Sequence, residues 1–192
     1  MASLVLSGDT SGSITVSAPA VAGSTTQTLV NVTGTLAPIV SGTAVASTSG
    51  TSIDFTGIPS WVKRITVMFQ GVSTNGSSGI LIQIGAGSIT SSGYLGSGSS
   101  IASTVGSSNY TTGFGIGQST QTAAFVRHGM ASLATPASNI WFFNGLLGQS
   151  DAGQTLIGGG TLALGGTLDR VRITTVNGTD TFDAGTINIL YE

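Results

Sequence analysis

Apolar and polar positions alternate most clearly in residues 53–76. One parity of this stretch is mainly apolar and holds Lys63, Ile65, Val67 and Phe69. Because successive side chains of a strand point to opposite faces, the pattern predicts a strand whose apolar parity faces a core. Pro59 precedes the strand, where its fixed φ and missing N–H are tolerated, and Asn75-Gly76 after it is a common turn dipeptide.

Short segments of the same kind recur up to residue 192, whereas no window of 11 or more residues shows helical periodicity. The predicted strands cover residues 53–56, 62–70, 79–84, 110–117, 123–128, 139–147, 168–176 and 186–191, with weaker segments near 94–95, 161–164 and 181–182. The predicted turns lie at 75–76, 97–100, 135–136, 158–160 and 177–178. This spacing predicts an all-β domain over residues 53–192, an antiparallel β-sandwich or jelly roll.

The first 38 residues differ from this domain because they contain no aromatic residue and no large apolar cluster. Alternation on both sides of a Gly-containing loop at 7–12 predicts a hairpin, and a second pair is predicted over 28–32 and 35–39. A lone hairpin is marginal in water, so this β-rich N-terminal arm is expected to pack on a larger body. Residues 39–52 are small and low in complexity, which predicts a linker or an extended strand, with a domain boundary near residues 40–50.

Charge is scarce: 6% of the 192 residues are charged, and five of them are Lys or Arg. A nucleic-acid partner requires a basic surface, which five cations do not supply. A weakly charged surface with many strand edges favours self-association, so we expect an oligomer. No apolar run approaches the roughly 18 residues that span a bilayer, and membrane insertion is not expected.

The sequence predicts no catalytic residue, no metal site and no cofactor. His128 is the only histidine and there is no cysteine, whereas transition-metal sites use several such ligands. No Gly-x-Ser-x-Gly pattern stands between a predicted strand and helix. Asp180 and Asp183 lie in a turn-like segment, where capping of the turn is the favoured interpretation and a calcium site the alternative. We therefore expect a protein that is not an enzyme.

Two aromatic residues, Trp61 and Tyr94, lie near predicted loops. Exposed rings of this kind stack on sugars, so both are candidates for contact with a ligand or a host-surface glycan. Four charged residues in or beside strands are candidates for subunit contacts: Lys63, Arg64, Asp169 and Arg170. The last two are expected to form cross-strand or inter-chain pairs.

Two sequence patterns indicate that another sheet, subunit or backbone packs closely against predicted strands. In Trp141-Phe142-Phe143, neighbouring rings point to opposite faces, so a second sheet or a neighbouring subunit is expected to cover one face. The alternation of Gly and Phe over residues 113–117 lacks the helix and lysine of a phosphate loop. It predicts a strand that another backbone approaches closely.

Three segments resemble structural proteins of tailed bacteriophages, and most of all tail-fibre-like proteins. They are SLVLSGDTSGSITVSAPAVAG, SGTSIDFTGIPSWVKRITVMFQGVSTNG and LDRVRITTVNGTDTFDAGTINILYE. The resemblance implies a non-enzymatic virion component that is trimeric and has a β-rich body. It assigns no functional residue.

Two placements in the virion follow from this resemblance. In the first, the chain is a tail fibre or baseplate-attached fibre, with residues 1–38 as the attachment arm and the sandwich as a trimeric distal head that contacts the host. In the second, it is a decoration protein that stabilises the capsid. A polysaccharide-acting enzyme and a cellular lectin are less favoured alternatives.

Overall fold

The computed structural model describes residues 3–7, 11–17, 38–136 and 139–192, and the chain forms two units, residues 1–36 and 37–192. In the first unit, β1 (Ser3–Ser7) pairs antiparallel with β2 (Ser13–Ser17). This is the first predicted hairpin. The second, over residues 28–39, lies almost wholly outside the described residues.

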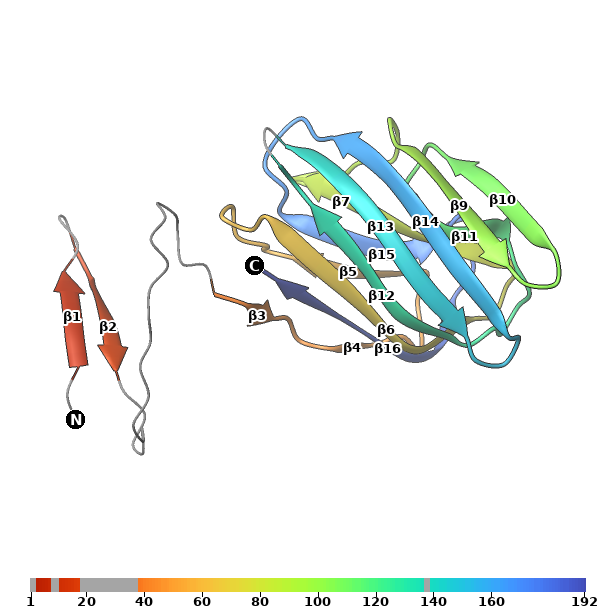
Figure 1. Ribbon diagram of the computed structural model, residues 1–192, viewed down its shortest axis with the longest axis horizontal. Coiled ribbons are helices and arrows are strands. Elements are labelled where there is room, and N and C mark those ends of the chain that lie inside the picture. The colour runs from red at the N-terminus through yellow and green to blue at the C-terminus, as the bar shows by residue number, and fades with distance from the viewer. Residues whose placement is uncertain (1–2, 8–10, 18–37, 137–138) are drawn as a thin grey trace. The chain divides into compact units, whose positions relative to one another are not determined.

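The second unit is a sandwich of two antiparallel sheets (Figure 1). The large sheet has the order β10 (Val105–Tyr110), β9 (Leu95–Ile101), β14 (Gln154–Ala163), β13 (Ile140–Gln149), β12 (Arg127–Ala134), β6 (Arg64–Thr74), β16 (Phe182–Tyr191), β3 (Val40–Ser41), and β4 (Val45–Ala46) also pairs with β16. The small sheet has the order β11 (Phe114–Thr120), β7 (Ser78–Ala86), β15 (Arg170–Thr175), β5 (Ser52–Thr56), and β8 (Ser88–Ile89) pairs with β7. The described residues contain no helix. The predicted all-β antiparallel sandwich is confirmed, and jelly-roll connectivity stays a prediction.

The core lies between the two sheets. On β6, Ile65, Val67 and Phe69 are buried, so the apolar parity read from the sequence does face the core. Aromatic rings also pack between the two sheets where β11 faces β13. Phe114 of β11 stacks on Phe143 of β13 with ring centroids 4.8 Å apart. Burial of a large aliphatic or aromatic side chain contributes about 1.5–3 kcal/mol, so this layer supplies most of the stabilisation.

Several predicted boundaries in the Gly- and Ser-rich half are wrong. The predicted strand at 110–117 is the end of β10, a turn and the start of β11. Most of the predicted strand at 123–128 is irregular, since β12 begins only at Arg127. The predicted turns at 97–100 and 158–160 lie inside β9 and β14. In these two strands the inward-facing glycines, Gly98, Gly158 and Gly160, permit close packing and do not mark chain reversal.

The sheets approach each other most closely where β11 passes over β9 and β14. A Cβ atom added at Gly158 would lie 2.1 Å from the carbonyl oxygen of Gly115, and one added at Gly98 would lie 2.5 Å from that of Gly117. The Tyr110 hydroxyl donates a hydrogen bond of 2.8 Å to the Gly117 carbonyl. The prediction that another backbone approaches this strand closely is confirmed, and the glycines are what permit it.

Residues 39–52 contribute two short strands to the sandwich, so of the two alternatives the extended strand describes this segment and the linker does not. β3 and β4 pair with β16 at the edge of the large sheet. The Gly42 amide donates to the Ile189 carbonyl at 2.7 Å, and the Ser47 amide donates to the Gly185 carbonyl at 2.9 Å. The segment contributes backbone hydrogen bonds instead of core side chains, which is why its sequence shows little apolar pattern.

Candidate functional site

The candidate site is the solvent face of five neighbouring strands, β10, β9, β14, β13 and β12. Alternation is complete in β13: Trp141 and Phe143 are buried against the second sheet, whereas Phe142 is 48% exposed. The prediction that both faces of this strand carry rings, with one face covered by the second sheet, is confirmed. We call the solvent side of these five strands the outer face.

The pairing register aligns the outer-face side chains in four rows that run across the strands. The first row is Ala134, Phe142, Thr161 and Leu95. The second is Ser132, Asn144, Gly159, Ser97 and Asn109. The third is Met130, Leu146, Ile157, Ser99 and Ser107. The fourth is His128, Gly148, Thr155, Ile101 and Val105.

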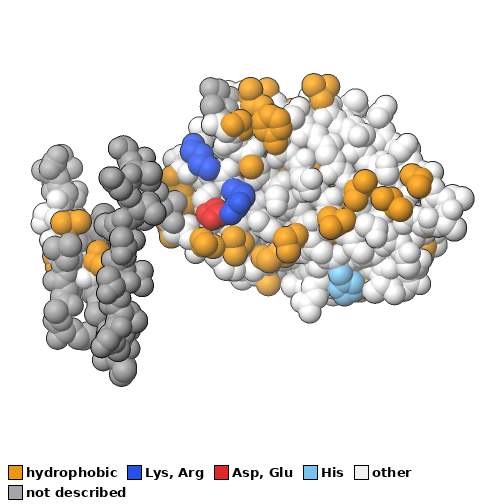
Figure 2. Space-filling model, in the orientation of Figure 1, with side chains coloured by type: hydrophobic (Ala, Val, Ile, Leu, Met, Phe, Trp, Pro, Cys, Tyr) orange, Lys and Arg blue, Asp and Glu red, His pale blue; other side chains and the backbone are white. Residues whose placement is uncertain are grey.

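The outer face exposes large apolar side chains and carries no Lys, Arg, Asp or Glu. The exposed apolar residues are Leu95, Ile101, Val105, Met130, Ile140, Phe142, Leu146 and Ile157. Arg127 is the only one of these charged residue types in the five strands, and it is buried. Figure 2 shows apolar groups scattered over this side of the sandwich, with the Lys, Arg and acidic side chains gathered toward one end. Large apolar side chains that are exposed together on one uncharged face indicate an interaction surface.

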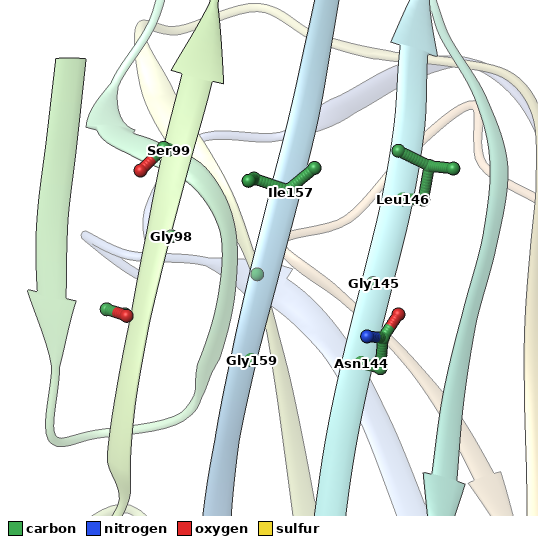
Figure 3. A pocket seen from close by; sticks show the side chains of 9 residues that line it. Gly98, Ser99, Asn144, Gly145, Leu146, Ile157 and Gly159 are labelled. Atoms are coloured by element: carbon green, nitrogen blue, oxygen red, sulfur yellow. The ribbon is translucent and has the colours of Figure 1, made fainter. Parts of the chain in front are cut away.

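A hollow of about 430 Å³ lies on the outer face. It is lined by Ser97, Gly98, Ser99, Asn144, Gly145, Leu146, Ile157, Gly158 and Gly159. Figure 3 shows Leu146 and Ile157 at one level on neighbouring strands and Gly159 bare beside Asn144 at the next. The lining holds no titratable side chain, so it suits an apolar or hydrogen-bonding group and offers no acid or base.

Trp61, Lys63 and Arg64 lie together at the entrance of β6. Trp61 is 40% exposed, and its ring centroid lies 5.9 Å from that of Tyr191. Arg64 forms an ion pair with Glu192, and the Lys63 amide donates to the Glu192 carbonyl at 2.8 Å. Ligand contact by Trp61 and subunit contact by Lys63 and Arg64 stay predictions.

The exposure predicted for Tyr94 is wrong. The side chain is 1% exposed and its ring meets Phe114 edge to face, with centroids 4.8 Å apart. The hydroxyl donates to the Thr90 carbonyl and accepts from the Ile84 amide, both at 2.9 Å. Burial raises the pKa of Tyr94 to about 12. The backbone of the adjacent loop satisfies the hydroxyl, so the ring joins the core instead of projecting from the loop.

Asp169 and Arg170 pair with each other, through bonds of 2.7 and 3.0 Å, rather than across strands. The hydrogen bond from the Arg170 guanidinium lowers the pKa of the Asp169 carboxyl. The cross-strand pair of the small sheet is instead Asp54 with Arg172, whose two bonds are both 2.7 Å. None of these residues lies on the outer face of the large sheet.

Asp180 and Asp183 accept hydrogen bonds within the fold. Asp180 accepts from the Ser78 amide at 2.8 Å and from the Asn177 side-chain amide at 2.6 Å, as expected for a turn-capping residue. Asp183 accepts a hydrogen bond from the Ser73 hydroxyl. In the part of the chain that the structure describes, no group of three or more His, Cys, Asp or Glu side chains is placed to hold a metal ion.

A buried polar cluster at Arg127 was not predicted from the sequence. Its Nε and Nη2 donate to the Gln121 side-chain oxygen at 3.1 and 2.8 Å, and Nη1 donates to the Phe125 carbonyl at 3.0 Å. Gln149 donates to the same Gln121 oxygen at 3.1 Å. Burial lowers the pKa of Arg127 to about 10. The only signal in the sequence is an arginine at a core-facing position, and the hydrogen bonds to Gln121 and Phe125 occupy all three guanidinium nitrogens.

Comparison with protein-family models, with curated proteins and with solved structures found no match to this chain. Among the described residues there is no helix long and apolar enough to cross a membrane.

Proposed function

We propose that this chain is a non-enzymatic structural protein of a tailed-bacteriophage virion, a fibre component that assembles through its outer face. The resemblance of three segments to tail-fibre-like proteins supports the virion setting. The observation that carries the assembly role is the outer face itself, where apolar side chains are exposed on five strands that expose no Lys, Arg, Asp or Glu. Its partners are then further copies of the chain and other virion proteins, with the sandwich as the part that meets the host.

The N-terminal arm supplies the attachment in this proposal. Its hairpin is a pair of five-residue strands, and Val5, Leu6 and Val16 are each more than half exposed. A two-stranded hairpin with exposed apolar side chains is marginal in water. Docking on a larger particle would bury these side chains and stabilise the hairpin.

Immunogold labelling of purified virions tests the proposal. An antibody raised against residues 37–192 is applied to virions of the phage whose genome encodes the chain. We expect gold on the tail or baseplate. Gold distributed over the capsid would replace the fibre role with the decoration role, and unlabelled virions would overturn the virion role altogether. If the arm provides attachment, virions produced with a chain that lacks residues 1–36 should bind no gold.

A further inference from the structure

Two glycines of the outer face, Gly148 and Gly159, have no steric reason within the chain to be glycine. A Cβ at Gly148 would meet nothing within 4 Å, and one at Gly159 would meet only the Phe143 carbonyl oxygen at 3.8 Å. Neither has a positive φ. Every other described strand glycine has a positive φ or would place a Cβ within 3.1 Å of another atom. Glycine weakens a strand, and its presence marks sites where another molecule approaches closely.

The four rows of the outer face are complementary to themselves. Adjacent rows lie two residues apart along each strand, or about 7 Å. A two-fold axis that runs across the strands, midway between the second and third rows, places the second row on the third row of another copy. The same rotation places the first row on the fourth. Each strand then lies antiparallel on its own counterpart.

On β12, β13 and β14 this superposition places four large side chains on smaller ones, whereas at the edge Leu95 of β9 falls on Ile101 of the second copy. Ile157 falls on Gly159 of the second copy, and Phe142 falls on Gly148. Leu146 and Met130 fall on Asn144 and Ser132 in the same way. The hollow beside Gly159 is therefore the space into which Ile157 of another copy fits.

From this match we propose that the outer face packs on the outer face of a second copy about that two-fold axis. The inference rests on the proposed assembly role and names its partner. It predicts pairs of chains at this face, whereas the resemblance to tail-fibre-like proteins implies three.

The size and charge of the face suit a second copy. The five strands at about 4.8 Å spacing and four rows at about 7 Å spacing give roughly 670 Å² of projected face, within the range of about 600–1,000 Å² that each partner contributes to a standard interface. Sheets packed face to face lie about 10 Å apart with strands within about 30° of parallel or antiparallel, which accommodates their twist. Because the outer face exposes no Lys, Arg, Asp or Glu on its five strands, two identical copies meet without like-charge repulsion there.

Sedimentation equilibrium of the full-length chain, alone in solution, tests the pairing. The expected mass is that of two 19.0 kDa chains. Gly159→Val fills the hollow and blocks Ile157 of the other copy, so the dissociation constant should rise about 10- to 100-fold. Ile157→Ala removes the side chain that fills the hollow and should also weaken pairing, by about tenfold. Thr56→Val, which replaces an exposed hydroxyl on the small sheet by a methyl group, should leave the mass unchanged.

The exchange variant Ile157→Ala/Gly159→Val separates pairing from simple damage to the strand. In the two-fold arrangement each new valine meets an alanine of the other copy, so the dissociation constant should return to within about threefold of the native value. Circular dichroism confirms that each variant keeps the β-fold. Three results would each overturn the inference. The native chain could be monomeric or trimeric, or Gly159→Val could leave the dissociation constant of the dimer unchanged. The exchange variant could also have a dissociation constant as high as those of the single variants. A monomer that still labels virions would overturn the pairing and leave the virion role standing.

Discussion

Replacement of Gly158 by alanine tests whether the two sheets are held at backbone contact. The new Cβ would lie 2.1 Å from the Gly115 carbonyl oxygen and 3.3 Å from the Ile116 Cα. Both partners are backbone atoms, so no side-chain rotation relieves the overlap. Strands β14 and β11 must separate by about 1 Å, because non-bonded heavy atoms approach no closer than roughly 3–3.5 Å.

The cost of that separation follows from the side chains packed beside Gly158. A buried side chain makes about 50 atom contacts of about 0.15 kcal/mol each, and a gap approaching 1 Å forfeits about a quarter of their energy. Each affected side chain therefore loses about 2 kcal/mol. Phe114 and Ile116 of β11 both lie in the buried layer, so we expect a loss of about 3–4 kcal/mol in the free energy of unfolding.

Denaturant unfolding of the full-length chain, followed by circular dichroism at one fixed protein concentration, measures this loss. Gly165→Ala is the matched control, because a Cβ at Gly165 meets nothing within 4 Å and its φ is not positive. That control should change stability by less than about 0.5 kcal/mol. A Gly158→Ala variant that unfolds within about 1 kcal/mol of the native chain would refute close backbone contact between the sheets.

Two further predictions concern pH and a turn. Burial raises the pKa of Tyr94 to about 12 and that of Tyr110 to about 12, so the folded chain keeps two protons that unfolded tyrosines release near pH 10. The two buried tyrosines therefore contribute their full stabilisation below pH 10, and this contribution is lost as the pH rises toward 12. Phenolate absorbance measures their ionisation, and circular dichroism recorded at the same pH values measures unfolding. Asp180→Ala leaves the Ser78 amide without its acceptor and should lower the free energy of unfolding by about 1–3 kcal/mol in denaturant.

A specific result would contradict each of these two predictions, on pH and on the turn. Phenolate absorbance that develops fully near pH 10, while the β-sheet signal is intact, would contradict the burial of Tyr94 and Tyr110. For the turn, Asp180→Asn is the comparison, because an amide oxygen still accepts from Ser78. An alanine variant as stable as the asparagine variant would show that this hydrogen bond contributes nothing.

Sequence patterns located the elements whose faces differ in polarity. β6 was predicted with its correct core face because Ile65, Val67 and Phe69 alternate with polar or partly exposed residues. β13 was predicted because Trp141 and Phe143 supply large apolar groups at alternate positions. In both strands the side chains that the core requires are the ones that periodicity detects.

Only the start of β9 and the end of β14 were predicted, as weak segments, because the space between the sheets excludes large side chains from the rest of these strands. A sequence of Gly and Ser with few apolar residues is typical of turns, and local patterns do not show that Gly98 faces a carbonyl of β11. The outer face was missed for a related reason. Its rows join Met130, Leu146 and Ile157 from three strands, and only the pairing register brings them together.

The three consecutive glycines of β14 show why glycine content alone predicts so little. Gly158 and Gly160 point inward, where a Cβ would lie 2.1 and 2.7 Å from backbone oxygens of β11 and β9. Gly159 between them points outward and has room for a side chain within its own chain. The inner pair is therefore explained by folding, and the outer residue by what covers the face. Gly158→Ala should then unfold the chain more easily, while Gly159→Val should leave the fold intact and separate the copies.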